Sequence, residues 1–266
     1  MQNSDLFKTV NEMADLANKE LGQNYLINEE IANKIVKLLD INDKDDVFEI
    51  GSGFGSLSNF LLDEPYKTLT LNDIDPRSIT FLEDLTKTKR RAYVINKSAL
   101  KVDLSTYSKI IGNLPYYITN DLLETCLSKS NAKKYVFMVQ KEVLNRLTAS
   151  PNNEEYGPLS VLIHSIGAIK KEFMVNRDNF NPAPHVDSVV FSIISLNIEK
   201  IDYYKFLQFL KRVFLHRRKT IYNNLSLYLM DKEKAKNILE SLNLSILFRP
   251  EQIDADTYLK IYRKTL

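Results

Sequence analysis

Short runs of β-branched and aromatic residues recur over the first 196 residues, and segments with apolar positions three and four residues apart lie between several of them. Such runs predict strands, and the three-and-four spacing predicts helices. The predicted strands are residues 47–50, 68–71, 92–95, 109–111, 135–139 and 189–196. The predicted helices among them are residues 28–39, 76–85, 120–127 and 141–149.

This alternation predicts an α/β fold with a mostly parallel sheet and helices on both faces, because parallel neighbours need a long crossover connection. The strand pattern stops after Leu196, and residues 203–215, 231–242 and 255–264 have helical spacing. The pattern therefore predicts an α/β domain over residues 1–197 and a small all-α domain over residues 198–266.

The composition is ordinary for a globular protein, with 44% hydrophobic and 26% charged residues. The single cysteine, Cys126, excludes an internal disulfide, and three histidines far apart in the chain match no zinc spacing, so we expect no metal site. The first 20 residues contain no apolar run of signal-peptide or membrane-spanning length. We expect a cytoplasmic protein without a membrane partner.

The net charge of +2 is unevenly distributed. Residues 199–266 contain 14 Lys and Arg against 8 Asp and Glu, a net charge of +6, whereas residues 1–198 have a net charge of −4. A basic patch is what phosphate neutralisation requires, so the C-terminal domain is the predicted nucleic-acid contact. The alternative is a solvated helical surface with incidental lysines.

A glycine-rich turn follows the strand at residues 47–50 and opens a helix. Gly51 and Gly53 let the backbone approach a ligand closely, and Asp73, 22 residues after Gly51, can accept hydrogen bonds from both hydroxyls of a ribose. A nicotinamide cofactor fits this geometry too, which keeps an oxidoreductase open as an alternative. The spacing G-x-G-x-G resembles the first motif of class I methyltransferases, whose donor, S-adenosylmethionine, has no phosphate. Glu49 is then expected near the cationic end of the donor.

Residues 113–116, NLPY, decide between these reactions. The lone pair of the adenine N6 is delocalised into the ring, so a methyltransferase needs acceptors that hold the amine in an sp³-like form. Asn113 and the Leu114 carbonyl are the predicted acceptors, and Pro115 restricts Leu114 to an extended conformation. Tyr116, or Tyr117 beside it, is placed to stack on a base taken out of its helix. An ordinary strand-to-helix turn is the alternative.

These residues resemble the ribosomal RNA adenine dimethyltransferase family. Similar segments in the family's order extend from about residue 21 to residue 266. They are residues 21–26 (LGQNYL), 49–55, 113–117, 140–142 (QKE), 156–157, 159–161, 180–184 (FNPAP), 186–188 (VDS), 217–220 (RRKT) and 223–225 (NNL).

The resemblance implies a Rossmann-like class I methyltransferase domain with a seven-stranded mostly parallel sheet, followed by a helical domain that helps to hold RNA. It implies transfer of methyl groups from S-adenosylmethionine to N6 of two adjacent adenosines in a hairpin near the 3′ end of small-subunit rRNA. Each adenosine becomes N6,N6-dimethyladenosine. The expected partner is this rRNA within an immature 30S particle, and the expected state is a monomer.

The resemblance also implies roles for individual residues. Asn24 and Leu26 are expected to line the methionine end of the donor, and Asn113 is expected to contact the donor as well as the target amine. Phe180 is expected to sandwich the target adenine against Tyr116; the alternative is a core phenylalanine beside a turn. Ser98 stands where the family normally has an aspartate that accepts from the donor's adenine amine. A serine is shorter and uncharged, so we expect weaker donor binding, by on the order of 1 kcal/mol.

Arg217, Arg218 and Lys219 are expected to contact phosphates. The alternative is a basic surface that pairs with the acidic first domain. Two rival functions stay open on sequence: a large-subunit (23S) rRNA adenine methyltransferase of the macrolide-resistance type, and a non-catalytic ribosome-assembly factor derived from the enzyme. The first usually has isoleucine at the position of Leu114, and intact residues 113–116 argue against the second.

Overall fold

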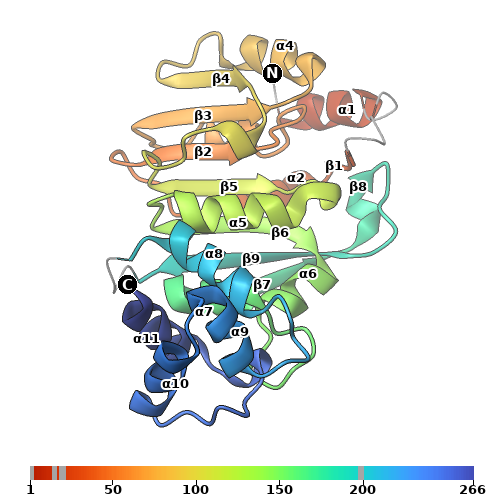
Figure 1. Ribbon diagram of the computed structural model, residues 1–266. Coiled ribbons are helices and arrows are strands. Elements are labelled where there is room, and N and C mark those ends of the chain that lie inside the picture. The colour runs from red at the N-terminus through yellow and green to blue at the C-terminus, as the bar shows by residue number, and fades with distance from the viewer. Residues whose placement is uncertain (1–2, 14–16, 18–21, 197–200) are drawn as a thin grey trace. The chain divides into compact units, whose positions relative to one another are not determined.

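The computed structural model of the protein describes residues 3–13, 17, 22–196 and 201–266. The chain forms two compact units (Figure 1). The first comprises Met1–Leu144 and Lys170–Ser195, and the second comprises Asn145–Ile169 and Leu196–Leu266. This division corrects the single boundary expected near residue 198, because residues 145–169 belong to the second unit.

A seven-stranded sheet forms the centre of the first unit, and the predicted α/β class with a mostly parallel sheet is confirmed. β2, β3, β4, β5 and β6 are parallel neighbours, and β9 runs antiparallel to β6. In spatial order the strands are β4 (Ala92–Asn96), β3 (Thr68–Asp73), β2 (Asp46–Ile50), β5 (Lys109–Asn113), β6 (Lys134–Gln140), β9 (Ser188–Ser195) and β7 (Gly167–Val175).

Helices cover both faces of this sheet, and Figure 1 shows α5 in front of it with α2 behind. Side-chain caps fix where two of the helices begin: Asn28 accepts from the Ile31 amide at α2, and Asp75 accepts from the Arg77 amide at α4. The helices that begin in this unit are α1 (Asn3–Met13), α2 (Glu29–Lys37), α3 (Ser58–Leu61), α4 (Pro76–Thr86), α5 (Thr119–Lys129) and α6 (Lys141–Leu147), with short 3-10 turns η3 (Ala99–Lys101), η4 (Tyr116–Ile118) and η5 (Arg177–Asn179).

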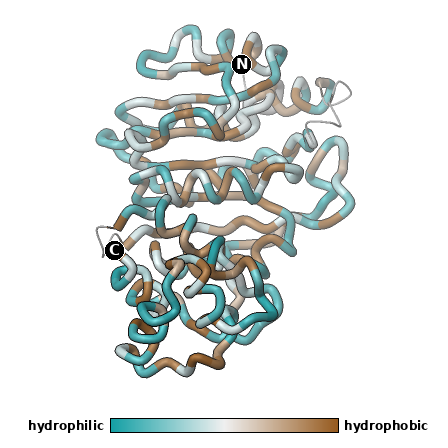
Figure 2. Tube along the Cα trace, viewed as in Figure 1, coloured by the Kyte–Doolittle hydropathy of each residue, from teal (hydrophilic) through white to brown (hydrophobic). Residues whose placement is uncertain are grey.

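Apolar residues fill the central strands, so they pack against helices on both sides (Figure 2). β5 shows the pattern: Ile110 and Ile111 are fully buried although they point to opposite faces. A separate two-stranded pair, β1 (Tyr25–Leu26) with β8 (Phe180–Asn181), lies beyond the carboxyl ends of the sheet strands (Figure 1). It holds the segment that precedes α2 at the end of the sheet where ligands bind in such folds.

The second unit is helical. α7 packs against both α8 and α11, which explains why residues 145–169 belong here rather than to the sheet. Its core is aromatic: Phe206 and Phe209 both pack against Tyr262, and Phe214 packs against Tyr258. The helices are α7 (Pro158–Ile166), α8 (Tyr203–Val213), α9 (Ile221–Leu229), α10 (Lys232–Ser241) and α11 (Ala255–Thr265), with the 3-10 turn η6 (Pro250–Gln252).

Among the residues that the structure describes, none of the helices has the length and apolar character that crossing a bilayer requires.

Candidate active site

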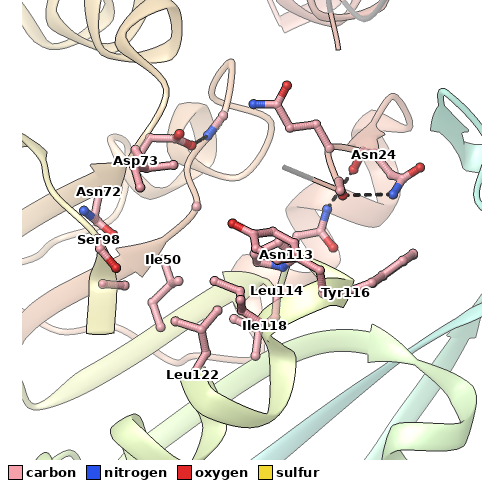
Figure 3. A pocket seen from close by; sticks show the side chains of 18 of the residues that line it. Asn24, Ile50, Asn72, Asp73, Ser98, Asn113, Leu114, Tyr116, Ile118 and Leu122 are labelled. Carbon is pink, nitrogen blue, oxygen red and sulfur yellow. Dashed lines mark hydrogen bonds between the residues drawn. The ribbon is translucent and has the colours of Figure 1, made fainter. Parts of the chain in front are cut away.

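A pocket lies at the carboxyl ends of β2, β3 and β5, where the loops that follow these strands meet (Figure 3). Parallel α/β sheets bind their ligands at this edge. The pocket brings together nine of the residues singled out from the sequence: Asn24, Gly51, Gly53, Asp73, Ser98, Asn113, Leu114, Pro115 and Tyr116. In Figure 3, Asp73 and Ser98 line one side, and Asn24, Asn113 and Tyr116 line the other.

The glycine-rich turn adopts the conformation that its glycines predict. Gly51 and Gly53 have φ values of +65° and +52°, in the region that residues with a Cβ rarely enter. A Cβ on Gly53 would also lie only 2.9 Å from the Tyr25 ring. The Gly53 amide donates to Asp73 Oδ2 over 2.7 Å, so the turn is fixed against the neighbouring strand.

Asp73 ends β3 and is 8% exposed. Its Oδ1 accepts from the Asp75 amide over 2.8 Å, so each carboxylate oxygen already has one backbone donor. Burial raises the pKa of Asp73, against these donors, which lower it. A carboxylate has about four acceptor positions, so not all of them are used by the backbone, and Asp73 can still accept from a ribose.

The segment before α2 is tied to the pocket at two points. Gln23 Nε2 donates to Asp75 Oδ2 over 2.9 Å, and Asn113 Nδ2 donates to the Asn24 carbonyl over 3.1 Å. Arg77 also donates to Asp75, and this guanidinium holds the pKa of that carboxyl down at about 2. Sequence reasoning missed Gln23 and Asp75, because neither motif shows that the two loops meet.

The NLPY turn holds its polar atoms in fixed positions. Because the Asn113 amide nitrogen is used by Asn24, its oxygen is left to accept from a ligand. The Leu114 amide donates to the Met138 carbonyl over 3.0 Å, and no described residue donates to the Leu114 carbonyl. The Tyr116 hydroxyl lies 2.9 Å from the hydroxyl of the fully buried Ser188. Ser188 belongs to the VDS segment that resembles the family, but its contact with Tyr116 could not be predicted from sequence.

Two expected pocket residues lie elsewhere. Leu26 is 1% exposed and Phe180 is 3% exposed; they face each other in the β1–β8 pair and belong to the hydrophobic core. Neither lines the pocket. Phe180 thus packs as a core residue, which is the alternative to the base-stacking role expected from the resemblance. The exposed ring beside Tyr116 is that of Tyr117, which is 53% exposed and lines the pocket.

Glu49 also differs from its expectation. It is 1% exposed, does not line the pocket, and accepts from the Ser58 hydroxyl over 2.5 Å. Burial raises its pKa to about 7, although the hydrogen bond from Ser58 lowers it. Glu49 therefore supports the base of the glycine turn, and it does not face the donor.

Arg217, Arg218 and Lys219 lie in the second unit, between α8 and α9. Arg217 is pinned: it donates to the Asn153 carbonyl over 3.1 Å, and its Nε lies 3.8 Å from Glu251 Oε2. Arg218 and Lys219 are exposed, and neither forms an ion pair or side-chain hydrogen bond with any residue the structure describes. Arg218 and Lys219 can therefore make the phosphate contact that was expected of all three residues, whereas Arg217 is already engaged.

Residues 14–263 match the sequence profile of a family described as "Ribosomal RNA adenine dimethylase". The chain belongs to the ribosomal RNA adenine dimethylase family. It is 38% identical over 256 residues to the ribosomal RNA small subunit methyltransferase A of Malacoplasma penetrans, covering 92% of this chain and 90% of that protein. It is 40% identical over 244 residues to the protein of the same name from Mycoplasma mobile, covering 90% and 94%.

Two solved structures of methyltransferases share the fold of this chain. A dimethyladenosine transferase from Plasmodium falciparum superposes with a TM-score of 0.73 at 26% identity, covering 89% of this chain and 97% of that one. The 23S rRNA methyltransferase ErmE superposes with a TM-score of 0.65 at 19% identity, covering 91% and 99%, which shows a shared fold.

Proposed function

We propose that this member of the ribosomal RNA adenine dimethylase family is an S-adenosylmethionine-dependent enzyme that dimethylates N6 of two adjacent adenosines in a hairpin near the 3′ end of small-subunit rRNA. The observation that carries the proposal is the arrangement of Asn113: its amide nitrogen is engaged by the Asn24 carbonyl, so its oxygen is left to accept from a ligand in the pocket that Asp73 also lines. The relatives named small subunit methyltransferase A support the choice of substrate.

The pocket fits S-adenosylmethionine. Asp73 retains acceptor positions for a ribose, and Gly51 leaves open the space that a Cβ would occupy. Gly55, where a dinucleotide loop would extend, packs instead against Leu85 and Phe81. Asn24, Gly51, Gly53, Asp73 and Ser98 would hold the donor, which supplies an electrophilic methyl group on a sulfonium when bound.

The residues of the NLPY turn then orient the acceptor. The Asn113 oxygen and the Leu114 carbonyl would accept from the N–H hydrogens of the adenine amine, which would localise its lone pair on N6 and direct it toward the donor. Pro115, with φ −63° and ψ 131°, follows Leu114 and fixes the turn. Tyr116, anchored by Ser188, and the exposed Tyr117 supply aromatic faces for the base.

In the second unit, Arg218 and Lys219 are the proposed phosphate contacts. Such contacts position an RNA without reading its sequence. We further propose that the substrate is rRNA in an immature 30S particle, bound by a single chain in the cytoplasm.

The test uses small subunits from cells that lack this protein. Asn113→Ala is expected to lower methyl transfer by on the order of 10²–10³-fold, as loss of a preorganised transition-state contact does elsewhere, with a smaller loss of donor binding because the bond to the Asn24 carbonyl is also removed. The matched control is Asn131→Ala, in the loop before β6. Mass spectrometry of the rRNA maps the modified adenosines. Dimethylation by the Asn113 variant at the wild-type rate, or modification of large subunits instead, would contradict the proposal.

A further inference from the structure

Two loops of the second unit are linked at two points. Arg217 and Glu251 form an ion pair, and the Ile221 amide donates to the Phe248 carbonyl over 2.6 Å. We call residues 216–220 the basic loop and residues 245–249 the apolar loop. Between the two links, the basic loop presents Arg218 and Lys219 to solvent.

The basic loop has a fixed backbone. Asn224, which is 1% exposed, donates to the carbonyls of His216 and Thr220 over 3.1 and 3.0 Å, and it accepts from the His216 amide over 3.2 Å. These three hydrogen bonds join one buried side-chain amide to both ends of the basic loop. The two free cations therefore project from an ordered support.

The apolar loop exposes three large hydrophobic residues in a row. Ile246 is 38% exposed, Leu247 75% and Phe248 38%, and the loop after α10 is coloured hydrophobic in Figure 2. The turn itself is ordered, since the amides of Leu247 and Phe248 both donate to Ser245. A rigid turn with exposed apolar side chains is a feature of interaction surfaces rather than of solvated loops.

The charges near the apolar loop indicate what kind of molecule it binds. Arg218 and Lys219 are exposed between the two links, Arg249 is exposed within the apolar loop, and the nearby acid Glu251 is engaged by Arg217. A positive rim attracts phosphates, and the apolar centre needs a flat apolar face. The outside of a paired RNA helix presents sugars and phosphates, whereas an unpaired nucleotide presents both a phosphate and the face of a base.

We propose that the apolar loop takes an unpaired nucleotide of the RNA substrate, with Leu247 and Phe248 covering the base while Arg218 and Lys219 contact the flanking phosphates. This inference rests on the proposed function for the class of partner. It adds a second nucleotide-binding site, within the helical unit, that discriminates unpaired from paired RNA.

The experiment measures the affinity of the full-length protein for two RNAs of equal length by fluorescence anisotropy, one a hairpin with an unpaired loop and one a perfect duplex. The double variant Leu247→Ser/Phe248→Ser is expected to bind the hairpin about tenfold more weakly, as loss of one stacked base predicts, and to bind the duplex as wild type does. Phe248→Tyr is expected to retain hairpin affinity. The matched control Leu227→Ser, at an exposed apolar position at the far end of α9, should change neither.

Arg218→Gln/Lys219→Gln should behave differently. It is expected to weaken the binding of both RNAs. It should also reduce the slope of log affinity against log salt by about 1.5, since each phosphate contact contributes about 0.7–0.9. The apolar variant should leave that slope unchanged. Equal weakening of hairpin and duplex by Leu247→Ser/Phe248→Ser, or no weakening of either, would overturn the proposal.

Other occupants have distinct signatures. Loss of binding to vesicles of anionic lipid, or a shift in sedimentation from dimer to monomer, without any change in hairpin affinity, would assign the apolar loop to a membrane or to a second copy and would also overturn the proposal. The proposed function fails separately: if the wild type does not methylate small subunits yet its hairpin affinity still depends on Phe248, the nucleotide site stands and the catalytic assignment falls.

Discussion

The pocket of the first unit and the basic loop of the second are built on opposite principles. In the pocket, the side chains of Asp73, Asn113 and Tyr116 each have a hydrogen-bonding partner that fixes their position. In the basic loop, Asn224 fixes the backbone, whereas Arg218 and Lys219 extend freely into solvent. The contrast matches the tasks proposed for them: methyl transfer depends on atoms held to within a fraction of an ångström, whereas phosphate neutralisation depends mainly on where charge is concentrated.

Among these variants, the largest expected effect is on the pH dependence of stability, and it comes from Glu49, the buried acid beneath the pocket. Its pKa is about 7 in the folded protein and about 4.5 as an ordinary glutamate, so the folded state binds the proton more tightly. The resulting stabilisation is fully present below about pH 4.5 and is lost as the pH rises through 7, a change of about 3 kcal/mol. Glu49→Gln stays neutral and should lack this loss, because its carbonyl can still accept from Ser58.

Urea unfolding between pH 5 and pH 8 measures the difference. The exposed Glu83→Gln in α4 is the control and should keep the wild-type pH dependence. If Glu49→Gln also keeps it, the Glu49 carboxyl is not the source of the pH dependence of the free energy of unfolding.

Asp73→Asn tests whether preorganised acceptors hold the donor. The asparagine keeps the shape but loses the charge, and its NH₂ must face a backbone donor from Gly53 or Asp75. Hydrogen bonds to charged groups contribute about 1.5–3 kcal/mol, so the dissociation constant for S-adenosylmethionine should rise by roughly 10–100-fold. Calorimetry measures it, with the exposed Asp84→Asn as control. An unchanged constant would mean that the ribose is held elsewhere.

Much of the first region could be predicted because its elements carry strong local patterns. All six predicted strands form, and Gly51, Asp73 and Asn113 lie at strand ends, which parallel topology brings to one edge. β7 was missed because its sequence, GAIKKEFMV, places charges in the middle of an edge strand, where one side of the ladder faces no neighbour. α7 was missed because six of its nine residues are buried, so it lacks the broad polar face by which an exposed amphipathic helix is found in a sequence.

Side-chain partners could not be predicted. Phe180 has the same local sequence whether it faces a pocket or a core, and only the pairing of β1 with β8 shows which. Likewise the RRKT segment does not show that Arg217 meets Glu251, 34 residues further along the chain. These outcomes depend on contacts between distant segments, and no local pattern encodes them.

Asn224→Ala tests whether the second region needs order at all. Removing the amide leaves the carbonyls of His216 and Thr220 without this donor, so the basic loop should loosen. RNA affinity should fall by roughly fivefold, about 1 kcal/mol of lost preorganisation, while donor binding stays unchanged. Filter binding measures the first and calorimetry the second. The neighbour Asn223→Ala is exposed and is the control. Full RNA affinity in Asn224→Ala would show that free cations suffice without an ordered support.

Ser98→Asp gives the smallest expected effect and tests where the pocket departs from its family. Ser98 lines the pocket before η3, and its side chain caps no backbone amide there. An aspartate would accept directly from the adenine amine of the donor, where the shorter serine needs a water between them. One such bond is worth about 1 kcal/mol, so the variant should bind S-adenosylmethionine roughly fivefold more tightly. Ser98→Ala is the matched control, and it should bind no more tightly than wild type. If aspartate brings no gain, the adenine end of the donor is held by contacts other than residue 98, and the preorganisation of the pocket is concentrated at Asp73 and Asn113.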